Sequence, residues 1–280
     1  MRRGIIEVVW AMVAVCAFVG AAGAADRSAL TALNGQLRVG MECAYAPSNW
    51  QEMAPSETNV PVENVPGAYA EGYDVQIARI VAEHLGVELV IVKMDWDGLI
   101  PALNAGRIDA IIAGMMDTAE RRQAVDFSET YAHMPTEYSM LVNAGSPYEG
   151  ARTIQDFAGA SVLGQKDTAL DTVIDQIQGV NHLPAVSSVP DMLARLREGA
   201  CDAVVINWEN AEGYLATTPS FRLVRFEREE DGFVLPAKGS CVGIRKSDGW
   251  LRELVDEAIV AVDRPTRTAM WDAAVAAQPR

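Results

Sequence analysis

The stretches IPALNAGRIDAII (residues 100–112) and MLARLREGACDAVV (residues 192–205) have the same pattern at two places in the chain. Each has apolar residues at helical spacing, a glycine that can end the helix in a left-handed conformation, and an Asp-Ala pair that begins an apolar run. A helix, a glycine cap and a buried strand are common to parallel α/β proteins, so the repeat indicates shared architecture. The second copy replaces Ile100, Leu103, Gly106, Asp109 and Ala110 with Leu193, Leu196, Gly199, Asp202 and Ala203. We therefore predict two α/β units, which most naturally close on a ligand from opposite sides.

The residues before the first copy extend it into a complete α/β unit. Strands are expected at residues 37–41, where apolar side chains alternate, and at residues 87–94. Between them, residues 73–86 place their apolar side chains on one face of a helix that ends at Gly86. Strands that alternate with helices predict right-handed crossovers and a mostly parallel sheet with helices on both faces.

A second unit surrounds the second copy. Residues 160–164 are typical of a strand and residues 167–179 of a helix. After the second copy come a strand at residues 241–246 and two helices, without another strand-helix-strand unit. The chain is therefore expected to cross back and complete the first unit. The predicted division is a first lobe of residues 26–135 and 235–280 and a second lobe of residues 136–234.

The first 25 residues differ in composition from the rest of the chain. The basic start MRRG precedes the apolar run VVWAMVAVCAFVGAA (residues 8–22) and small residues that suit a cleavage site. An uncleaved membrane anchor is the alternative, but a span needs about 17 to 25 apolar residues and this run is shorter. We predict a signal peptide at residues 1–25, cleaved after Ala24 or Ala25, and a mature protein on the far side of a membrane.

The mature chain is expected to be strongly acidic. Without Arg2, Arg3 and Glu7, the 23 basic and 38 acidic residues become 21 and 37, a formal charge of −16. Such a surface repels nucleic acid and anionic membranes, so neither is predicted as a partner.

Cysteine and histidine usage predicts neither a disulfide framework nor a metal site. Three cysteines remain in the mature chain, which allows at most one disulfide: Cys43, Cys201 and Cys241. Three histidines stand apart without partners at ligand spacing: His84, His133 and His182. No cofactor is predicted.

The stretch AGMMDTAERRQAVDFSETY (residues 113–131) carries the most chemical information. Asp117 and Glu120 have the spacing of a capping box, which predicts a helix start whose free N–H groups face the end of the preceding strand. Arg121 and Arg122 then fall in the first turn, where the helix dipole disfavours cations and a bound anion would offset that cost. The alternative is that both arginines are surface charges paired with a nearby carboxylate such as that of Glu120.

These residues resemble the periplasmic amino-acid-binding proteins of ABC transporters. The resemblance rests on residues 96–131, which contain the motif Thr-x-Glu-Arg-x-x-x-Val-Asp-Phe-Ser, together with MECAYAP at residues 41–47 and GYDVQIA at residues 72–78. It covers essentially the whole mature chain. It implies a two-lobed periplasmic-binding-protein-like α/β fold with two hinge crossovers, a monomer in the periplasm, and a membrane permease as partner.

The resemblance also assigns residues to the ligand. The arginine of the motif, Arg121, would clamp the ligand's α-carboxylate, with help from the backbone of Gly114 and Met116. Aromatic residues would cover the two faces of the ligand side chain, here Tyr45 and Trp96.

Glu42 is the residue that would decide the charge of the ligand. Relatives that select basic amino acids carry an acidic residue three positions before the tyrosine, and Glu42 stands there. A guanidinium or ammonium could pair with it while lying between the two aromatic faces.

Several positions depart from the family pattern. Asn207 stands where relatives hold the ligand's α-ammonium with Asp or Glu, and an amide oxygen accepts a hydrogen bond but brings no charge. Met116 replaces a serine. Asp167 replaces a glycine before a ligand-contacting threonine, Thr168, and either supplies the missing charge or, as we favour, caps a helix. Glu209, two residues after Asn207, is a further candidate for that charge.

Three functions are compatible with these residues. The leading hypothesis is an extracytoplasmic receptor that captures a basic or polar amino acid and delivers it to an ABC permease. A receptor for an N-methylated or betaine-like carboxylate is suggested by Asn207. A dehydratase of the cyclohexadienyl or arogenate type on the same scaffold would need a general acid facing the cleft, for which Asp167 and Glu209 are the candidates.

Overall fold

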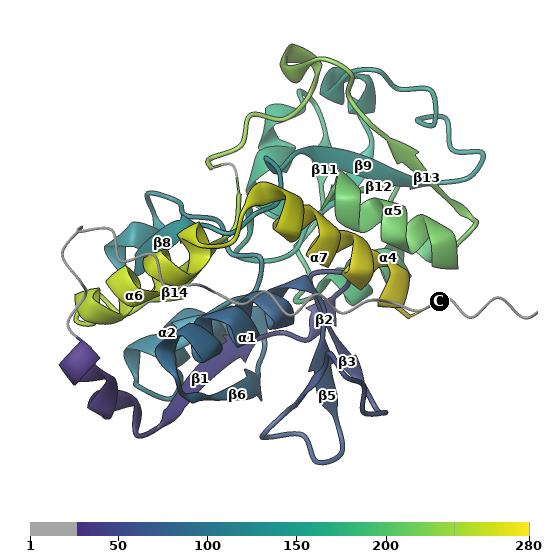
Figure 1. Ribbon diagram of the computed structural model, residues 1–280. Coiled ribbons are helices and arrows are strands. Elements are labelled where there is room, and N and C mark those ends of the chain that lie inside the picture. The colour runs from purple at the N-terminus through teal and green to yellow at the C-terminus, as the bar shows by residue number, and fades with distance from the viewer. Residues whose placement is uncertain (1–26, 238, 280) are drawn as a thin grey trace, which may run out of the picture.

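The computed structural model describes residues 27–237 and 239–279, and the predicted signal peptide lies outside them. Figure 1 shows two lobes. Each lobe contains a five-stranded sheet and has its own hydrophobic core. Within the described residues, no helix is long and apolar enough to cross a membrane. Three cysteines lie in the part of the chain that the structure describes, and all are buried free thiols: Cys43, Cys201 and Cys241.

The first lobe is built on the sheet with the order β6-β1-β7-β14-β8. Its strands are β1 (Gln36–Met41), β6 (Glu88–Lys93), β7 (Ala110–Ile111), β8 (Asp126–Thr130) and β14 (Cys241–Ile244). Its helices are α1 (Tyr73–Leu85), α2 (Leu99–Asn104), α6 (Gly249–Val260) and α7 (Arg264–Ala277). The first three pack on the sheet and α7 packs against α1.

A small antiparallel sheet and short 3-10 segments complete the first lobe. The small sheet contains β2 (Ala44–Tyr45), β3 (Asn49–Glu52), β5 (Tyr69–Glu71) and β4 (Val60–Pro61), in this order. The 3-10 segments of this lobe are η1 (Arg27–Leu33), η2 (Trp96–Gly98) and η3 (Arg121–Gln123).

The second lobe is built on the sheet with the order β11-β10-β12-β9-β13. Its strands are β9 (Tyr138–Asn143), β10 (Ser161–Leu163), β11 (Asn181–His182), β12 (Ala203–Asn207) and β13 (Phe221–Val224). Its helices are α3 (Ala169–Thr172), α4 (Val189–Arg197) and α5 (Trp208–Thr217), and its 3-10 segments are η4 (Ile154–Phe157), η5 (Val173–Gln176) and η6 (Glu229–Asp231).

The mostly parallel character of both sheets is confirmed. In the first sheet, only β14 runs against the other strands, since it is antiparallel to both β7 and β8. In the second sheet, only β9 does so, since it is antiparallel to both β12 and β13. The two exceptions are the strands that the chain forms directly after passing from one lobe to the other.

Both copies of the repeat fold as predicted. The first forms α2 and β7, the second α4 and β12, and each helix ends at a glycine with a positive φ, 70° at Gly106 and 72° at Gly199. The first helix also ends as predicted, with Gly86 in the left-handed conformation.

The helix predicted at residues 167–179 is shorter than expected. It consists of one α-helical turn, α3, followed by the 3-10 turn η5, and Ile177 is extended. Its backbone lies so close to Gly164 that a Cβ there would collide with Asp171. The run Thr172, Val173, Ile174 is β-branched and favours helix extension poorly.

Candidate functional site

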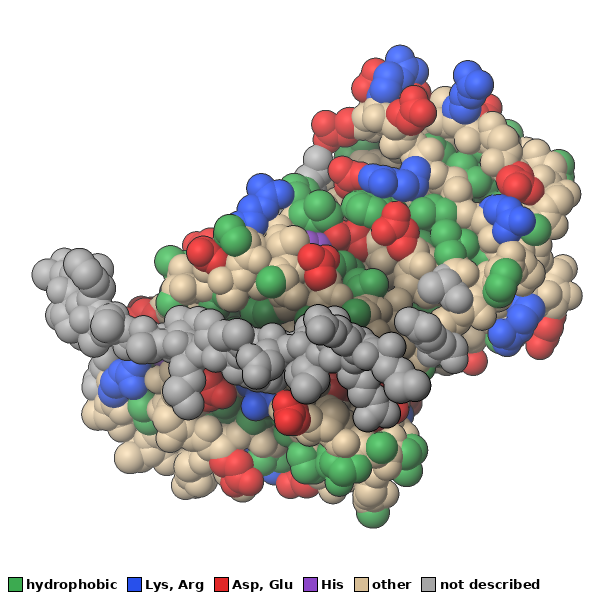
Figure 2. All heavy atoms as spheres, turned by 45° about the vertical axis from the view of Figure 1, so that its right-hand side comes forward, with side chains coloured by type: hydrophobic (Ala, Val, Ile, Leu, Met, Phe, Trp, Pro, Cys, Tyr) green, Lys and Arg blue, Asp and Glu red, His purple; other side chains and the backbone are tan. Residues whose placement is uncertain are grey.

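The space between the lobes lies at the carboxyl ends of parallel strands. Glu42 follows β1, Gln165 comes shortly after β10, and Asn207 ends β12. In open α/β sheets, ligands bind at these strand ends. Figure 2 shows the hollow between the lobes, where hydrophobic side chains gather with acidic side chains at the edges.

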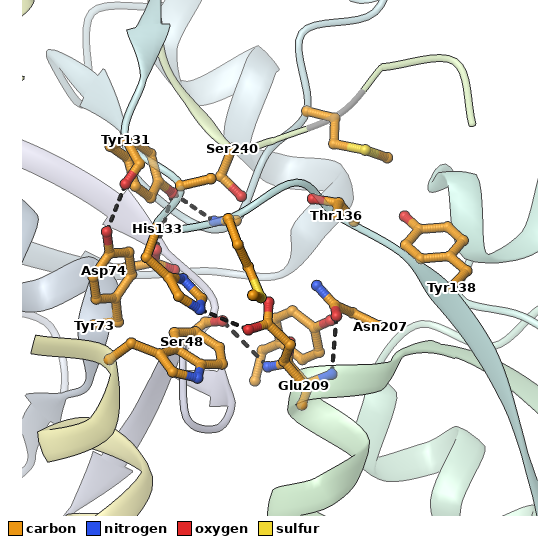
Figure 3. A pocket seen from close by; sticks show the side chains of 17 residues that line it. Ser48, Tyr73, Asp74, Tyr131, His133, Thr136, Tyr138, Asn207, Glu209 and Ser240 are labelled. Carbon is orange, nitrogen blue, oxygen red and sulfur yellow. Dashed lines mark hydrogen bonds and ion pairs between the residues drawn. The ribbon is translucent and has the colours of Figure 1, made fainter. Parts of the chain in front are cut away.

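Two adjoining cavities occupy this space. The first, here the Arg121 chamber, is lined by Glu42, Tyr45, Trp96, Ala113, Gly114, Met116, Arg121, Tyr138, Gln165, Thr168, Ala169 and Leu170. The second, here the Asn207 chamber, shares Tyr45, Gly114, Met116 and Tyr138 with it and adds Ser48, Asp74, Tyr131, His133, Thr136, Asn207, Glu209, Asn210 and Ser240, among others (Figure 3).

Arg121 points its guanidinium into the cleft. Nη1 donates a hydrogen bond to the carbonyl of Met116 (2.9 Å), and Nη2 donates one to the carbonyl of Asp167 in the other lobe (3.2 Å). The guanidinium lies 5.1 Å from the centre of the Trp96 ring, and burial lowers its pKa. Arg121 forms no ion pair with a carboxylate of the described residues, so this cation can bind an anionic ligand.

The predicted capping box at Asp117 and Glu120 is wrong. Asp117 forms an ion pair with Arg122, and the N–H of Arg121 instead donates to the hydroxyl of Thr118 (3.2 Å). The segment is only the 3-10 turn η3, because β8 begins shortly after it and leaves no room for an α-helix. Arg122 is therefore the surface arginine of the pair.

Glu42 is a buried carboxylate at the boundary between the lobes. Its Oε1 accepts a hydrogen bond from Nε2 of Gln165 in the other lobe (3.0 Å). Burial raises its pKa from 4.5 to about 7, and the charges of Asp95 and Asp97 act in the same direction. A cationic group beside Glu42 would offset this desolvation and keep the carboxylate ionised.

The two predicted aromatic residues both contact the opposite lobe. Trp96 Nε1 donates a hydrogen bond to the carbonyl of Asp167 (3.0 Å). Tyr45 packs against the hydrophobic core of the second lobe and lines both chambers. Gly114, at φ 66°, faces the Tyr45 ring, and its N–H donates to the hydroxyl of Tyr131 (3.0 Å). The backbone of Gly114 and Met116 thus already has protein partners, Tyr131 and Arg121.

The prediction that Asp167 caps a helix is wrong. Thr168 is the N-cap of α3, because its hydroxyl accepts the N–H of Leu170 (3.1 Å). Asp167 instead adopts a positive φ of 59°, which turns its carbonyl toward Trp96 and Arg121. Its exposed carboxylate lies 3.6 Å from Lys166 and lines neither chamber.

Asn207 and Glu209 both face the Asn207 chamber. Asn207 is the N-cap of α5, and its side-chain oxygen accepts the N–H of Glu209 (3.1 Å). The buried carboxylate of Glu209 lies 2.6 Å from Nε2 of His133, whose ring stacks on Trp271. Figure 3 shows this pair on the opposite side of the chamber from Thr136 and Tyr138.

Among the cleft residues that were not predicted as site residues are Gln165, His133 and Asn210. Gln165 bonds Glu42, His133 bonds Glu209, and Asn210 donates from Nδ2 to the carbonyl of Ala46 (3.0 Å). Only Gln165 had a usable signal, because it follows a predicted strand end. The other two act through partners that are distant in the sequence.

Known proteins resemble this chain in sequence and fold. The model of the bacterial extracellular solute-binding proteins, family 3, matches residues 37–269. A protein of Campylobacter jejuni named "Probable histidine-binding protein" is 34% identical over 164 residues, which are 58% of this chain and 60% of that protein. An arginine-binding extracellular protein of Bacillus subtilis is 28% identical over 219 residues, 74% of this chain and 78% of that protein.

A solved structure supports the same relationship. The substrate-binding protein of an amino acid ABC transporter from Streptococcus pneumoniae, bound to L-arginine, superimposes with a TM-score of 0.76. It is 25% identical, and the match covers 89% of this chain and 98% of that chain.

Proposed function

Because the chain belongs to the bacterial extracellular solute-binding proteins, family 3, we propose that it captures an amino acid between its lobes and delivers it to an ABC permease. The observation that carries the proposal is the position of the Arg121 guanidinium. It faces the cleft, and among the described residues it donates hydrogen bonds to backbone carbonyls and forms no ion pair with a carboxylate. A ligand carboxylate could pair with it through two parallel hydrogen bonds.

Basic amino acids, followed by polar ones, are the preferred ligands in this proposal. Glu42 lines the same chamber as Arg121, so a ligand with a carboxylate at one end and a cation at the other can satisfy both. Tyr45 and Trp96 would flank the cationic side chain. The relatives named for arginine and histidine support this preference.

The remaining predicted residues have smaller roles in the proposal. Thr168 lines the Arg121 chamber beside Gln165, and Met116 and Gly114 form the wall between the two chambers. Asp167 acts through its carbonyl, which orients Arg121 and Trp96 when the lobes are closed. Asn207 faces the second chamber.

Ligand capture is a closure of two lobes about their crossover segments. We propose that the lobes are residues 26–135 with 235–280, and residues 136–234. The separate hydrophobic cores support this division, and Leu235 packs against the second core as expected at a crossover. Contacts that join the lobes, such as that between Glu42 and Gln165, would then form on closure.

Export and delivery complete the proposal. A cleaved signal peptide would place a monomeric protein in the periplasm, where the closed form docks on its permease. The dehydratase alternative is disfavoured, because the relatives are solute-binding proteins and the carboxylate of Asp167 lies outside both chambers. The carboxylate of Glu209 lines the Asn207 chamber but is bonded to His133.

The test is a binding panel on purified protein freed of bound ligand. Arginine, lysine, ornithine, histidine and neutral polar amino acids would be compared by thermal shift and calorimetry. Ligand at 100 times its Kd stabilises the folded state by about 2.7 kcal/mol, so binding is visible as a rise in Tm. Stabilisation by none of these compounds would contradict the proposal.

Two arginine variants test the carboxylate clamp. Arg121→Ala should abolish binding, because it leaves the ligand's carboxylate without a partner in a closed cleft. Arg122→Ala is the matched control, since this exposed neighbour pairs with Asp117 and should bind ligand normally. Unchanged affinity in Arg121→Ala would remove Arg121 from the site.

A further inference from the structure

The orientation of the Asn207 amide is determined by its role as a helix cap. Its oxygen accepts the N–H of Glu209, so the side-chain nitrogen is the group left for the cavity. Figure 3 shows that nitrogen turned toward the middle of the chamber. It donates no hydrogen bond to any other described residue. A ligand that enters the chamber therefore meets the free N–H groups of Asn207, which are hydrogen-bond donors.

Other uncharged donors lie on the same side of the chamber. Thr136 and Tyr138 come from the segment that enters the second lobe, and Figure 3 shows their hydroxyls on the side where Asn207 lies. The hydroxyl of Thr136 already accepts the N–H of Gly239 (3.2 Å), which leaves its proton free to donate. Neutral donors that face one space suit a carbonyl oxygen of a ligand.

The carboxylates of the chamber are largely engaged by the protein. Asp74 accepts from Asn49 through one oxygen and from Tyr131 through the other. Glu209 shares Oε1 with His133. A free ammonium group next to Asn207 would thus face an N–H donor, which is unfavourable in a closed cavity.

The two chambers also adjoin each other, as one ligand that occupies both would require. Gly114, Met116, Tyr45 and Tyr138 line both. In an amino acid the α-nitrogen is bonded to the carbon next to the carboxylate. A ligand whose carboxylate sits on Arg121 can therefore extend a substituent of that nitrogen past this shared wall.

We propose that the Asn207 chamber receives a carbonyl group carried on the ligand's α-nitrogen, so that the preferred ligand is an N-acylated basic amino acid. This inference rests on the proposed function, in which Arg121 holds the carboxylate and Glu42 the side-chain cation. Two sources share this chemistry: a simple N-acyl amino acid and a dipeptide with a basic C-terminal residue. The dipeptide adds a terminal ammonium, which the second oxygen of Glu209 can accept.

The experiment is calorimetry with L-arginine, Nα-acetyl-L-arginine and glycyl-L-arginine on wild type and Asn207→Asp. At least one acylated compound should bind wild type about tenfold more tightly than L-arginine. This is the effect expected when one buried polar group is left without a hydrogen-bond partner in the weaker complex. Asn207→Asp should reverse this order, because a carboxylate accepts an ammonium and repels a carbonyl oxygen. Aspartate is as good an N-cap as asparagine, so α5 should keep its cap. Asn181→Asp, the same change at an exposed site of the second lobe, is the control and should leave the order unchanged.

The three possible outcomes distinguish the acyl site from the proposed binding of basic amino acids. Tighter binding of Nα-acetyl-L-arginine or of glycyl-L-arginine supports the acyl site and identifies its source. Tighter binding of L-arginine to wild type overturns the acyl site and leaves the proposed function intact. Binding of none of the three compounds, with intact folding by circular dichroism, removes both the basic-ligand proposal and the acyl site.

Discussion

In the first lobe, Gly106 ends α2 and donates its N–H to the carbonyl of Leu103, while Arg107 donates to Ala102. In the second lobe, Gly199 ends α4 and donates to Leu196, while Ala200 donates to Arg195. The aspartates after these glycines also correspond. Asp109 accepts the N–H of Arg38 (3.0 Å) from the neighbouring strand, and Asp202 accepts that of Ser161 (2.7 Å).

The lobes differ in the segment that comes after each copy of the repeat. After β7 the first lobe has a loop that leads to Arg121, and after β12 the second has a helix capped by Asn207. Across the Arg121 chamber, the first lobe brings the charged groups of Glu42 and Arg121. The second brings an amide from Gln165 and a carbonyl from Asp167. The repeated residues thus hold equivalent strands in place, and the unrepeated ones decide the chemistry.

The largest expected effect is at the charged group of the first lobe. Glu42→Gln should weaken binding of a cationic amino acid about 100-fold, because a buried charge pair is lost, and should leave neutral amino acids unaffected. Gln165 is the partner of Glu42 from the second lobe. Gln165→Ala should weaken binding of the same ligand about tenfold, because one hydrogen bond is lost. Calorimetry measures both. Glu83→Gln, an exposed position on α1, is the control, and equal losses at Glu42 and Gln165 would contradict the division of roles.

The two aspartates of the repeat should differ in their effect on stability. Asp109 also pairs with Arg245 (3.1 Å) and is partly buried, whereas Asp202 is exposed. Asp109→Ala should lower the free energy of unfolding by about 2 kcal/mol and Asp202→Ala by about 0.5 to 1 kcal/mol, since water can replace the lost bond at Asp202. Urea denaturation measures the loss of stability in both variants. A larger loss at Asp202 than at Asp109 would contradict this prediction.

Binding of a cationic ligand should depend on the protonation of Glu42. Because its pKa in the empty cleft is raised to about 7, the ligand must displace a proton below that pH. Affinity should then rise about tenfold per pH unit up to about pH 7 and level off above it. Calorimetry between pH 5 and 8 should show that the Kd of wild type changes by about two orders of magnitude. Glu42→Gln should remove this dependence. A flat wild-type profile would exclude Glu42 as the cation partner.

The same raised pKa predicts the opposite trend for the stability of the unliganded protein. The contribution of Glu42 is fully present below its ordinary pKa of 4.5 and is lost as pH rises through about 7. Asp74, buried and with its pKa raised to about 7, acts in the same direction. Measuring the free energy of unfolding against pH in wild type and in Glu42→Gln separates the contribution of Glu42 from that of Asp74. A wild-type stability that rises between about pH 4.5 and 7 would contradict the assignment of raised pKa values to these two carboxylates.

Small and equal effects on stability are expected at the two glycine caps. Gly106→Ala and Gly199→Ala should each cost about 1 kcal/mol, because φ is positive at both and an alanine is strained there. The space around each is open, so no collision adds to the strain. Gly106→Asn should cost less than Gly106→Ala, since asparagine tolerates the left-handed conformation. If the losses of stability at Gly106 and Gly199 differed widely, the two copies of the repeat would not be structurally equivalent.

Local patterns in the sequence were sufficient for the scaffold. Glycine caps, alternating apolar residues and the order of strands and helices depend on neighbours within a few residues, and they determined two α/β units with a return crossover. The motif around Arg121 was also readable, as was the position of Glu42 before Tyr45. The cap at Asp117 was misjudged because Arg122 competes for that carboxylate and Thr118 provides the hydrogen bond instead.

Only the tertiary structure decided which groups face one another across the cleft. Glu42 meets Gln165, 123 positions away in the chain, and Glu209 meets His133, 76 positions away. The direction of the Asn207 amide likewise depends on a helix cap that lies at the edge of a cavity. The sequence by itself determined the two units and the charges they carry, because those depend on local spacing. How the cleft divides into an Arg121 and an Asn207 chamber depends on how two separately folded cores dock, and no local pattern encodes that geometry.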